Sequence, residues 1–173
     1  MIEDIIRPIT KDDPFRLCFV CLGNICRSPT AEGLFIHKVR EAGYQDYFYI
    51  DSAGTAAYHV GEPANSKSQS VANQYGVILP SKARQFDYND LEDFELILAM
   101  DSENYRNLLS LDRKDQYSHK VRMMRAFDPQ PDHKEVPDPY YGGMDGFEKV
   151  YRILERSSEA LLDELKAHIQ HPG

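Results

Sequence analysis

The sequence predicts an α/β fold in which helices cover both faces of a central four-stranded parallel sheet. Short apolar runs rich in β-favouring residues alternate along the chain with segments whose apolar residues recur every three to four positions. At 173 residues and 42% hydrophobic content, the chain suits one doubly wound domain. In such a fold, ligands bind at the carboxyl ends of the strands.

The first strand and helix are predicted near the N-terminus. Residues 15–21, FRLCFVC, form a mostly apolar run between Pro14 and Gly23, as expected of a buried strand. Pro29 is expected as the first helical residue, and the helical pattern continues to Gly43. These signals predict a strand, a loop and a helix in that order.

The remaining elements follow from the same patterns. Asp101 or Ser102 is expected to cap a helix that carries Leu108 and Leu109, and Asp145 with Glu148 resembles a capping box that starts a long last helix. Further strands are predicted over 47–51, 94–100 and 121–124, a further helix over 66–75, and a long loop over 128–143.

Composition and charge exclude several classes of function. The chain has 20 Lys and Arg against 28 Asp and Glu, a net charge of -8, which argues against a nucleic-acid binder. No apolar stretch is long enough for a membrane span, and residues 1–14 lack the pattern of a signal peptide. We expect a cytoplasmic protein with an N-terminal extension, residues 1–14, and one domain, residues 15–173.

The loop after the first strand has the residues of an anion site. Cys21 and Arg27 are separated by five residues, and Gly23 lets the backbone curl so that several N–H groups point at one centre. The helix that follows adds its positive N-terminal end, and the Arg27 guanidinium can hold two phosphate oxygens. Ser28 could donate a hydrogen bond to the Cys21 sulfur. The sequence therefore predicts a phosphate-binding loop.

Cys21 is the candidate nucleophile of this loop. A thiol near a helix N-terminus and an arginine is commonly ionised at neutral pH, so no neighbouring histidine base is needed. Cys18 and Cys21 also form a C-x-x-C pair, but an odd offset along a strand sends the two side chains to opposite faces. Zinc ligation by the three cysteines and His37 matches no familiar spacing.

A phosphoryl transfer at Cys21 needs an acid that protonates the leaving group. Asp128 and Asp138 each precede a proline, and both are candidates. Asp138 is favoured because Tyr140 and Tyr141 offer aromatic faces to a phenyl ring. Asp128 is interpreted as a turn residue.

Two motifs together resemble the low-molecular-weight protein tyrosine phosphatases. VCLGNICRSP, residues 20–29, is similar to the signature loop of that family, and DPYYG, residues 138–142, to its second hallmark. DSAGT at residues 51–55 and KARQ at residues 82–85 extend the resemblance over most of the chain. It implies hydrolysis of phosphotyrosine in proteins, no metal and no cofactor, and inhibition by inorganic phosphate or vanadate.

The resemblance also implies residue roles. Cys21 is expected as nucleophile, Arg27 as phosphate ligand and Asp138 as general acid and base. Asn24 and Ser52 are expected to brace the loop, with Tyr75 where many members have a histidine. Cys26 could form a reversible disulfide with Cys21 or be a tolerated small residue, and His59 is expected at the surface. The substrate-binding residues implied are Leu22, Gly23, Asn24, Ile25, Cys26, Ser28, Tyr58, Tyr140 and Tyr141.

Three other functions stay open at this point. Related protein arginine phosphatases have a threonine where this chain has Ile25, which favours tyrosine. Arsenate reductases on the same fold use further cysteines, and no cysteine follows Cys26. A phosphate-binding module without activity would need Arg27 but not Asp138.

Overall fold

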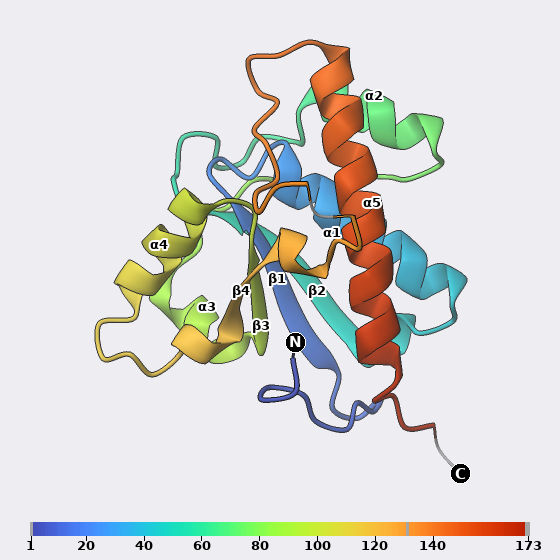
Figure 1. The fold of residues 1–173 in the computed structure, drawn as a ribbon, viewed down its shortest axis with the longest axis vertical. Helices are drawn as coiled ribbons and strands as arrows, with labels where there is room; N and C mark the ends of the chain where they lie inside the picture. Colours follow the sequence, from blue (N-terminus) through green and yellow to red (C-terminus); the bar gives the residue numbers. More distant parts are fainter. Residues whose placement is uncertain (1, 131, 172–173) are drawn as a thin grey trace.

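Four parallel strands form the sheet in the order β2-β1-β3-β4, as the computed structural model shows (Figure 1). The structure describes residues 2–130 and 132–171. It confirms the predicted α/β domain with one parallel sheet. The strands are β1 (Phe15–Cys21), β2 (Phe48–Gly54), β3 (Leu96–Ala99) and β4 (Val121–Met123).

Helices cover both faces of this sheet (Figure 1). The α-helices are α1 (Arg27–Glu41), α2 (Ser66–Gln74), α3 (Tyr88–Asp93), α4 (Ser102–Leu111) and α5 (Met144–Lys166). Short 3-10 helices lie at Gln45–Tyr47, Ser118–Lys120 and Met124–Phe127. Helices α1, α2 and α5 pack on one face, while α3 and α4 pack on the other.

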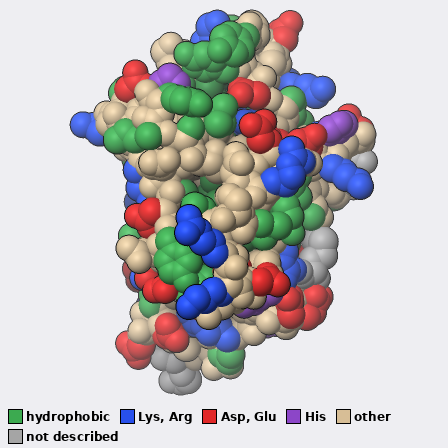
Figure 2. Space-filling model, turned by 90° about the vertical axis from the view of Figure 1, so that its left-hand side faces the viewer, with side chains coloured by type: hydrophobic (Ala, Val, Ile, Leu, Met, Phe, Trp, Pro, Cys, Tyr) green, Lys and Arg blue, Asp and Glu red, His purple; other side chains and the backbone are tan. Residues whose placement is uncertain are grey.

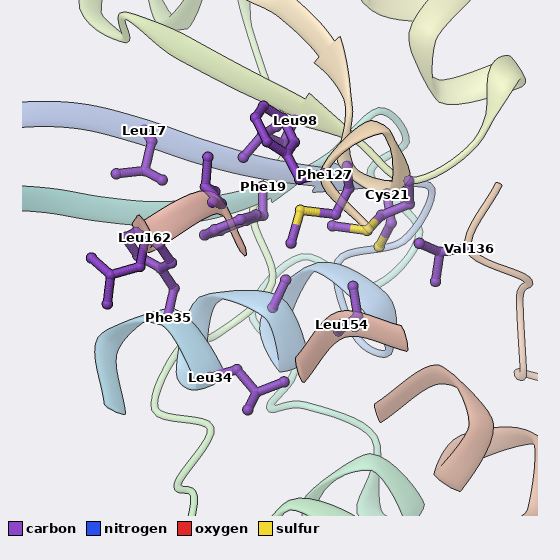
Figure 3. Packing of buried hydrophobic residues seen from close by; sticks show 14 of the residues in the cluster. Leu17, Phe19, Cys21, Leu34, Phe35, Leu98, Phe127, Val136, Leu154 and Leu162 are labelled. Carbon is purple, nitrogen blue, oxygen red and sulfur yellow. The ribbon is translucent and has the colours of Figure 1, made fainter. Parts of the chain in front are cut away.

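Strand β1 separates the two halves of the core. Leu17, Phe19 and Cys21 belong to the larger cluster, which lies between the sheet and helices α1 and α5 (Figure 3). Cys18 and Val20 belong to the smaller cluster beneath α3 and α4. The alternation confirms that Cys18 and Cys21 point to opposite faces. Because both faces are covered, the strand sequence is apolar throughout.

Several element boundaries differ from the prediction. Helix α1 begins at Arg27, so Pro29 is its third residue, a position in the first turn where an N–H has no intrahelical acceptor. The capping box predicted from Asp145 and Glu148 is wrong, because Gly143 is the N-cap and Asp145 already lies inside α5. Helix α3 was not predicted, since six residues are too short to show a helical period.

Strand β2 runs three residues past its predicted end. Ser52, Ala53 and Gly54 have low strand propensity, which hides the extension in the sequence. A Cβ atom on Gly54 would lie 2.7 Å from the carbonyl oxygen of Leu22. Small residues are therefore required where β2 approaches the loop that follows β1.

Residues before β1 pack against the far end of the sheet. Ile9 is fully buried and exchanges backbone hydrogen bonds of 2.9 and 2.8 Å with His168 and Gln170 beyond α5. Arg7 contacts the carboxylate of Glu95 and donates to backbone carbonyls of the same segment. The division of the chain at residue 14 stays a prediction, but the segment shares the main core through Ile2 and Ile9.

The surface carries mixed charge. Acidic and basic side chains are interspersed over the face shown in Figure 2. Within the described residues, no helix combines the length and apolar character needed to cross a membrane.

The packing of Ile9 predicts that the first residues stabilise the fold. Ile9→Ala should lower the free energy of unfolding by about 2 to 5 kcal/mol, because a fully buried side chain is lost. Ile78→Ala is the matched control, since Ile78 is 75% exposed and its loss should change stability by less than about 0.5 kcal/mol. Urea denaturation measures both. Equal stability of Ile9→Ala and wild type would contradict this packing.

Candidate active site

The candidate site is the loop of residues 22–26, which connects the carboxyl end of β1 to the N-terminus of α1. Its outer side is tied to the segment after β2, where the N–H groups of Thr55 and Ala56 donate to the carbonyls of Cys21 and Leu22 at 2.9 and 3.0 Å. Among the described residues, no N–H group of the loop itself donates to a protein acceptor. These amides are therefore available to an anion.

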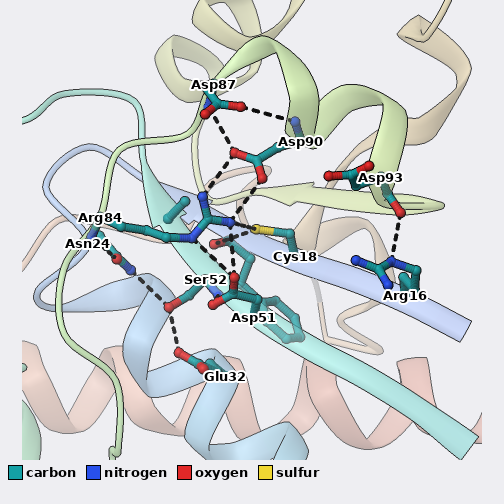
Figure 4. Close-up of polar contacts among 12 residues, drawn as sticks. Arg16, Cys18, Asn24, Glu32, Asp51, Ser52, Arg84, Asp87, Asp90 and Asp93 are labelled. Atoms are coloured by element: carbon teal, nitrogen blue, oxygen red, sulfur yellow. Dashed lines mark hydrogen bonds and ion pairs between the residues drawn. The ribbon is translucent and has the colours of Figure 1, made fainter. Parts of the chain in front are cut away.

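The Asn24 side chain stabilises the conformation of the loop through hydrogen bonds. Its φ of 57° lies in the left-handed region, and its side chain is buried. The amide nitrogen donates to Ser28 Oγ at 2.7 Å. It also donates to Ser52 Oγ at 2.9 Å, while the amide oxygen accepts from the N–H of Arg84 at 3.0 Å (Figure 4). Three hydrogen bonds thus offset the cost of a strained backbone.

These contacts leave the hydroxyl protons of Ser28 and Ser52 available to other acceptors. Because Asn24 donates to both hydroxyl oxygens, the hydroxyl protons are free to point elsewhere. Ser28 Oγ lies 3.0 Å from Cys21 Sγ, so Ser28 can donate to the sulfur. Ser52 Oγ donates to Glu32 Oε1 at 2.5 Å (Figure 4). Burial raises the pKa of the Glu32 carboxyl above its usual value.

Tyr75 has no place in this network. Its ring stacks on Tyr151, with centroids 4.5 Å apart. Asn24 is braced by Ser28, Ser52 and the backbone of Arg84 instead. The sequence does not reveal this, because position before a glycine was the only signal for Tyr75.

Arg27 is buried at the start of α1 and faces two carboxylates. Nη1 donates to Asp101 Oδ2 at 2.7 Å and to the carbonyl of Val136 at 3.1 Å, and Nη2 lies 3.6 Å from Asp138 Oδ2. Burial opposes the charge of Arg27, but Cys21 and Asp101 outweigh it and raise its pKa. The guanidinium is thus fixed in orientation and charged.

Asp101 was predicted only as a helix cap. It does cap α4, where its side chain accepts from the N–H of Asn104 at 2.7 Å, and it also binds Arg27. The signal for the second role was its place just after β3, since the carboxyl ends of neighbouring parallel strands meet at one edge of the sheet.

A pocket of about 140 Å³ opens above the loop. Asp138 lies at its edge, with the side chain 44% exposed and Oδ1 accepting from the N–H of Tyr140 at 3.0 Å. Asn24 and Ser28 lie outside this lining and are hydrogen-bonded to each other, and their predicted role in substrate binding stays a prediction. The pocket is lined by Cys21, Leu22, Gly23, Ile25, Cys26, Arg27, Tyr58, His59, Asp138, Tyr140 and Tyr141.

Cys26 and Asp128, two candidate residues from the sequence, lie in surroundings that limit their reactivity. Burial raises the pKa of the Cys26 thiol to about 12, so it is a neutral thiol at physiological pH. Asp128 is buried and bound by Arg125 and Arg156, away from the lining of the pocket. Burial opposes its charge, but hydrogen bonds led by that of Arg156 lower its pKa. Asp128 is therefore a structural residue.

A neighbouring cavity of about 350 Å³ lies on the other side of Asp138. Its lining includes Arg125, Glu135 and Lys149 but neither Cys21 nor Arg27. The smaller pocket, with the thiol at its floor, is therefore the candidate active site.

The raised pKa of Glu32 predicts a pH-dependent stability difference. Above the ordinary value of 4.5, the folded chain holds a proton that the unfolded chain releases, so this stabilising contribution is lost as pH rises to the raised pKa. Glu32→Gln has no such proton but keeps an acceptor for Ser52. Its free energy of unfolding relative to wild type should rise from pH 4.5 towards neutral pH. A difference that does not vary with pH would contradict burial of an ionisable group here.

Residues 16–171 match the family described as low molecular weight phosphotyrosine protein phosphatase. A protein-tyrosine-phosphatase of Streptomyces coelicolor is 39% identical over 90% of this chain and 96% of its own. A protein tyrosine phosphatase structure from Entamoeba histolytica has a TM-score of 0.85 and 40% identity, covering 88% of this chain and 97% of that one. A Drosophila arginine phosphatase structure has a TM-score of 0.81 and 31% identity over 87% of this chain and 97% of its own. The chain belongs to the low molecular weight phosphotyrosine protein phosphatase family.

Proposed function

We propose that the protein hydrolyses phosphotyrosine in proteins through a phosphocysteine intermediate. The observation that carries the proposal is one arrangement: a thiol, five amides without protein acceptors and a buried arginine meet in one loop, with a carboxyl group at its edge. In this proposal Cys21 is the nucleophile, Arg27 binds the phosphate and Asp138 is the general acid and base.

The loop stabilises negative charge on both the sulfur and the phosphate. Backbone N–H groups, the N-terminus of α1 and Arg27 all place positive potential at the same centre. The Ser28 hydroxyl lies 3.0 Å from the sulfur and is placed to donate to it. The same donors then hold the equatorial oxygens of the phosphoryl group as it passes from tyrosine to sulfur.

The reaction requires two steps with Asp138 in opposite roles. In the first, Cys21 Sγ forms the S–P bond, the P–O bond to the phenol breaks, and Asp138 gives its proton to the leaving oxygen. In the second, Asp138 takes a proton from water, the water oxygen attacks phosphorus, and the S–P bond breaks to release phosphate. The guanidinium of Arg27, held by Asp101, bridges the phosphate oxygens throughout.

The walls of the pocket suit an aromatic phosphate. Tyr58, Tyr140 and Tyr141 surround the opening and offer faces for a phenyl ring. A tyrosine-phosphorylated protein is therefore the proposed substrate, and inorganic phosphate and vanadate are the proposed inhibitors. We propose a cytoplasmic protein that uses neither metal nor cofactor.

Phosphoarginine is the second candidate substrate, because one structural neighbour is a Drosophila arginine phosphatase. The residue to examine is Ile25, which lines the pocket and is 8% exposed. An isoleucine adds apolar surface beside the substrate ring and offers no hydrogen bond to a guanidinium. This favours phosphotyrosine. Arsenate reduction is disfavoured because no cysteine follows Cys26.

Removal of the nucleophile should abolish turnover. Cys21→Ser should show no hydrolysis of p-nitrophenyl phosphate, because a serine hydroxyl is not ionised by this loop at neutral pH. Cys18→Ser is the matched control, since Cys18 lies on the opposite face of β1, outside the lining of the pocket. Measurable turnover by Cys21→Ser would contradict the phosphocysteine route.

Removal of the acid should slow hydrolysis in a way that depends on the leaving group. Asp138→Ala should lower kcat by about 10² to 10⁴ for phenyl phosphate, whose leaving oxygen needs a proton. The loss should be smaller for p-nitrophenyl phosphate, which leaves without one. Asp145→Ala, an exposed carboxylate outside the pocket, should not change either rate. Equal losses for both substrates would contradict a role in proton transfer.

A direct comparison of phosphotyrosine with phosphoarginine distinguishes the two substrate classes. Wild type should hydrolyse phosphotyrosine with the higher kcat/KM, and Ile25→Thr should shift the ratio towards phosphoarginine. A wild-type preference for phosphoarginine would overturn the proposed substrate.

A further inference from the structure

The carboxylate of Glu135 binds the N-terminus of α4, and the proposed reaction gives it no role. Its Oε2 accepts from the N–H of Ser102, the first residue of that helix, at 2.8 Å. A carboxylate at this place is stabilised by the helix dipole and satisfies an N–H that has no acceptor within the helix. Glu135 lies three residues before Asp138, so this contact joins the segment of the proposed general acid to α4.

The next residue, Val136, connects the same segment to the phosphate loop. Its side chain is fully buried, its N–H donates to the carbonyl of Met100 at 2.8 Å, and its own carbonyl accepts from Arg27 Nη1 at 3.1 Å. Met100 directly follows β3. The backbone of Val136 is therefore held between the end of the sheet and the proposed phosphate ligand.

Arg125 holds the backbone of Glu135. This arginine is 3% exposed, and its Nη1 donates to the Glu135 carbonyl at 2.9 Å. Its Nε donates to Asp128 Oδ2 at 3.1 Å, and its Nη2 contacts the Asp132 carboxylate. Glu135 is thus bound at its carboxylate by α4 and at its carbonyl by a buried guanidinium.

The side chain of Asp138 is less restrained than these residues. It is 44% exposed, its Oδ1 accepts from the N–H of Tyr140 within the same segment, and its Oδ2 lies 3.6 Å from Arg27 Nη2, which is too long for a hydrogen bond. A general acid must lie within hydrogen-bond reach of the leaving oxygen. The place of the Asp138 carboxyl relative to Cys21 therefore depends on how the preceding backbone is held.

We propose that Glu135 is a positioning residue, whose hydrogen bond to α4 fixes the backbone that carries Asp138 relative to the phosphate loop. The inference rests on the proposed function and assigns no chemical step to Glu135. The N-terminus of α4 is a common anchor, because its N-cap Asp101 binds Arg27 at 2.7 Å while Glu135 binds its first N–H. The phosphate ligand and the general acid are thereby tied to the same end of one helix.

The experiment compares kcat/KM for phenyl phosphate and p-nitrophenyl phosphate. This constant includes the step that breaks the P–O bond, in which phenyl phosphate needs the proton of Asp138 and p-nitrophenyl phosphate does not. Glu135→Ala should lower kcat/KM about tenfold for phenyl phosphate and much less for p-nitrophenyl phosphate, because a misplaced acid supplies only part of its catalytic effect. Glu135→Gln keeps an acceptor for the N–H of Ser102 and should lie closer to wild type.

Glu103→Ala is the matched control, since it removes an exposed carboxylate from the first turn of the same helix and should change neither rate. In the Asp138→Ala background, Glu135→Ala should have no further effect, because no acid is left to position. Unchanged rates in Glu135→Ala, equal losses for both substrates, or the same loss with and without Asp138 would overturn the inference while leaving phosphotyrosine hydrolysis intact. Failure of wild type to hydrolyse either aryl phosphate would overturn the proposed function and this inference together.

Discussion

The three hydrogen bonds of the Asn24 side chain are the constraint on which the site depends. They hold a non-glycine residue at a φ of 57°, and they connect the phosphate loop to α1, to β2 and to the backbone of Arg84. With that backbone fixed, the loop amides need no rearrangement to receive an anion. The cost of ordering the donors is met on folding rather than on binding, which is the physical basis of preorganisation.

Positive potential in an acidic protein must be local, and the fold concentrates it at the phosphate loop. Arg27 is buried and oriented by Asp101, yet Asp101 also caps α4, so one carboxylate joins the phosphate loop to the neighbouring strand β3. The N-terminus of α1 acts on the same point. Because acidic and basic side chains are interspersed on the face shown in Figure 2 and the net charge is -8, we expect attraction of a phosphate to depend on this short-range geometry.

The sequence predicted those elements of the fold that depend on residues close together in the chain. The β1 run is apolar because both faces of the strand are covered, and Gly43 and Gly76 end helices α1 and α2 with φ values of 79° and 76°. The loop composition likewise indicated an anion site.

Contacts made through the tertiary fold left no such signal. The Arg27–Asp101 pair requires β1 and β3 to be neighbours, and the position of His59 requires the segment after β2 to fold over Gly23. The bracing of Asn24 left no local signal either, because its partners come from α1, β2 and the backbone of Arg84, while Tyr75 stacks on α5.

The central proposal is that the loop binds a phosphate at the Cys21 sulfur in position for phosphoryl transfer. The rate of Cys21 alkylation by iodoacetamide at neutral pH, followed by mass spectrometry with and without vanadate, tests it most directly. The account predicts rapid labelling of Cys21 that vanadate suppresses. Absence of labelling at Cys21, or labelling that vanadate leaves unchanged, would contradict it.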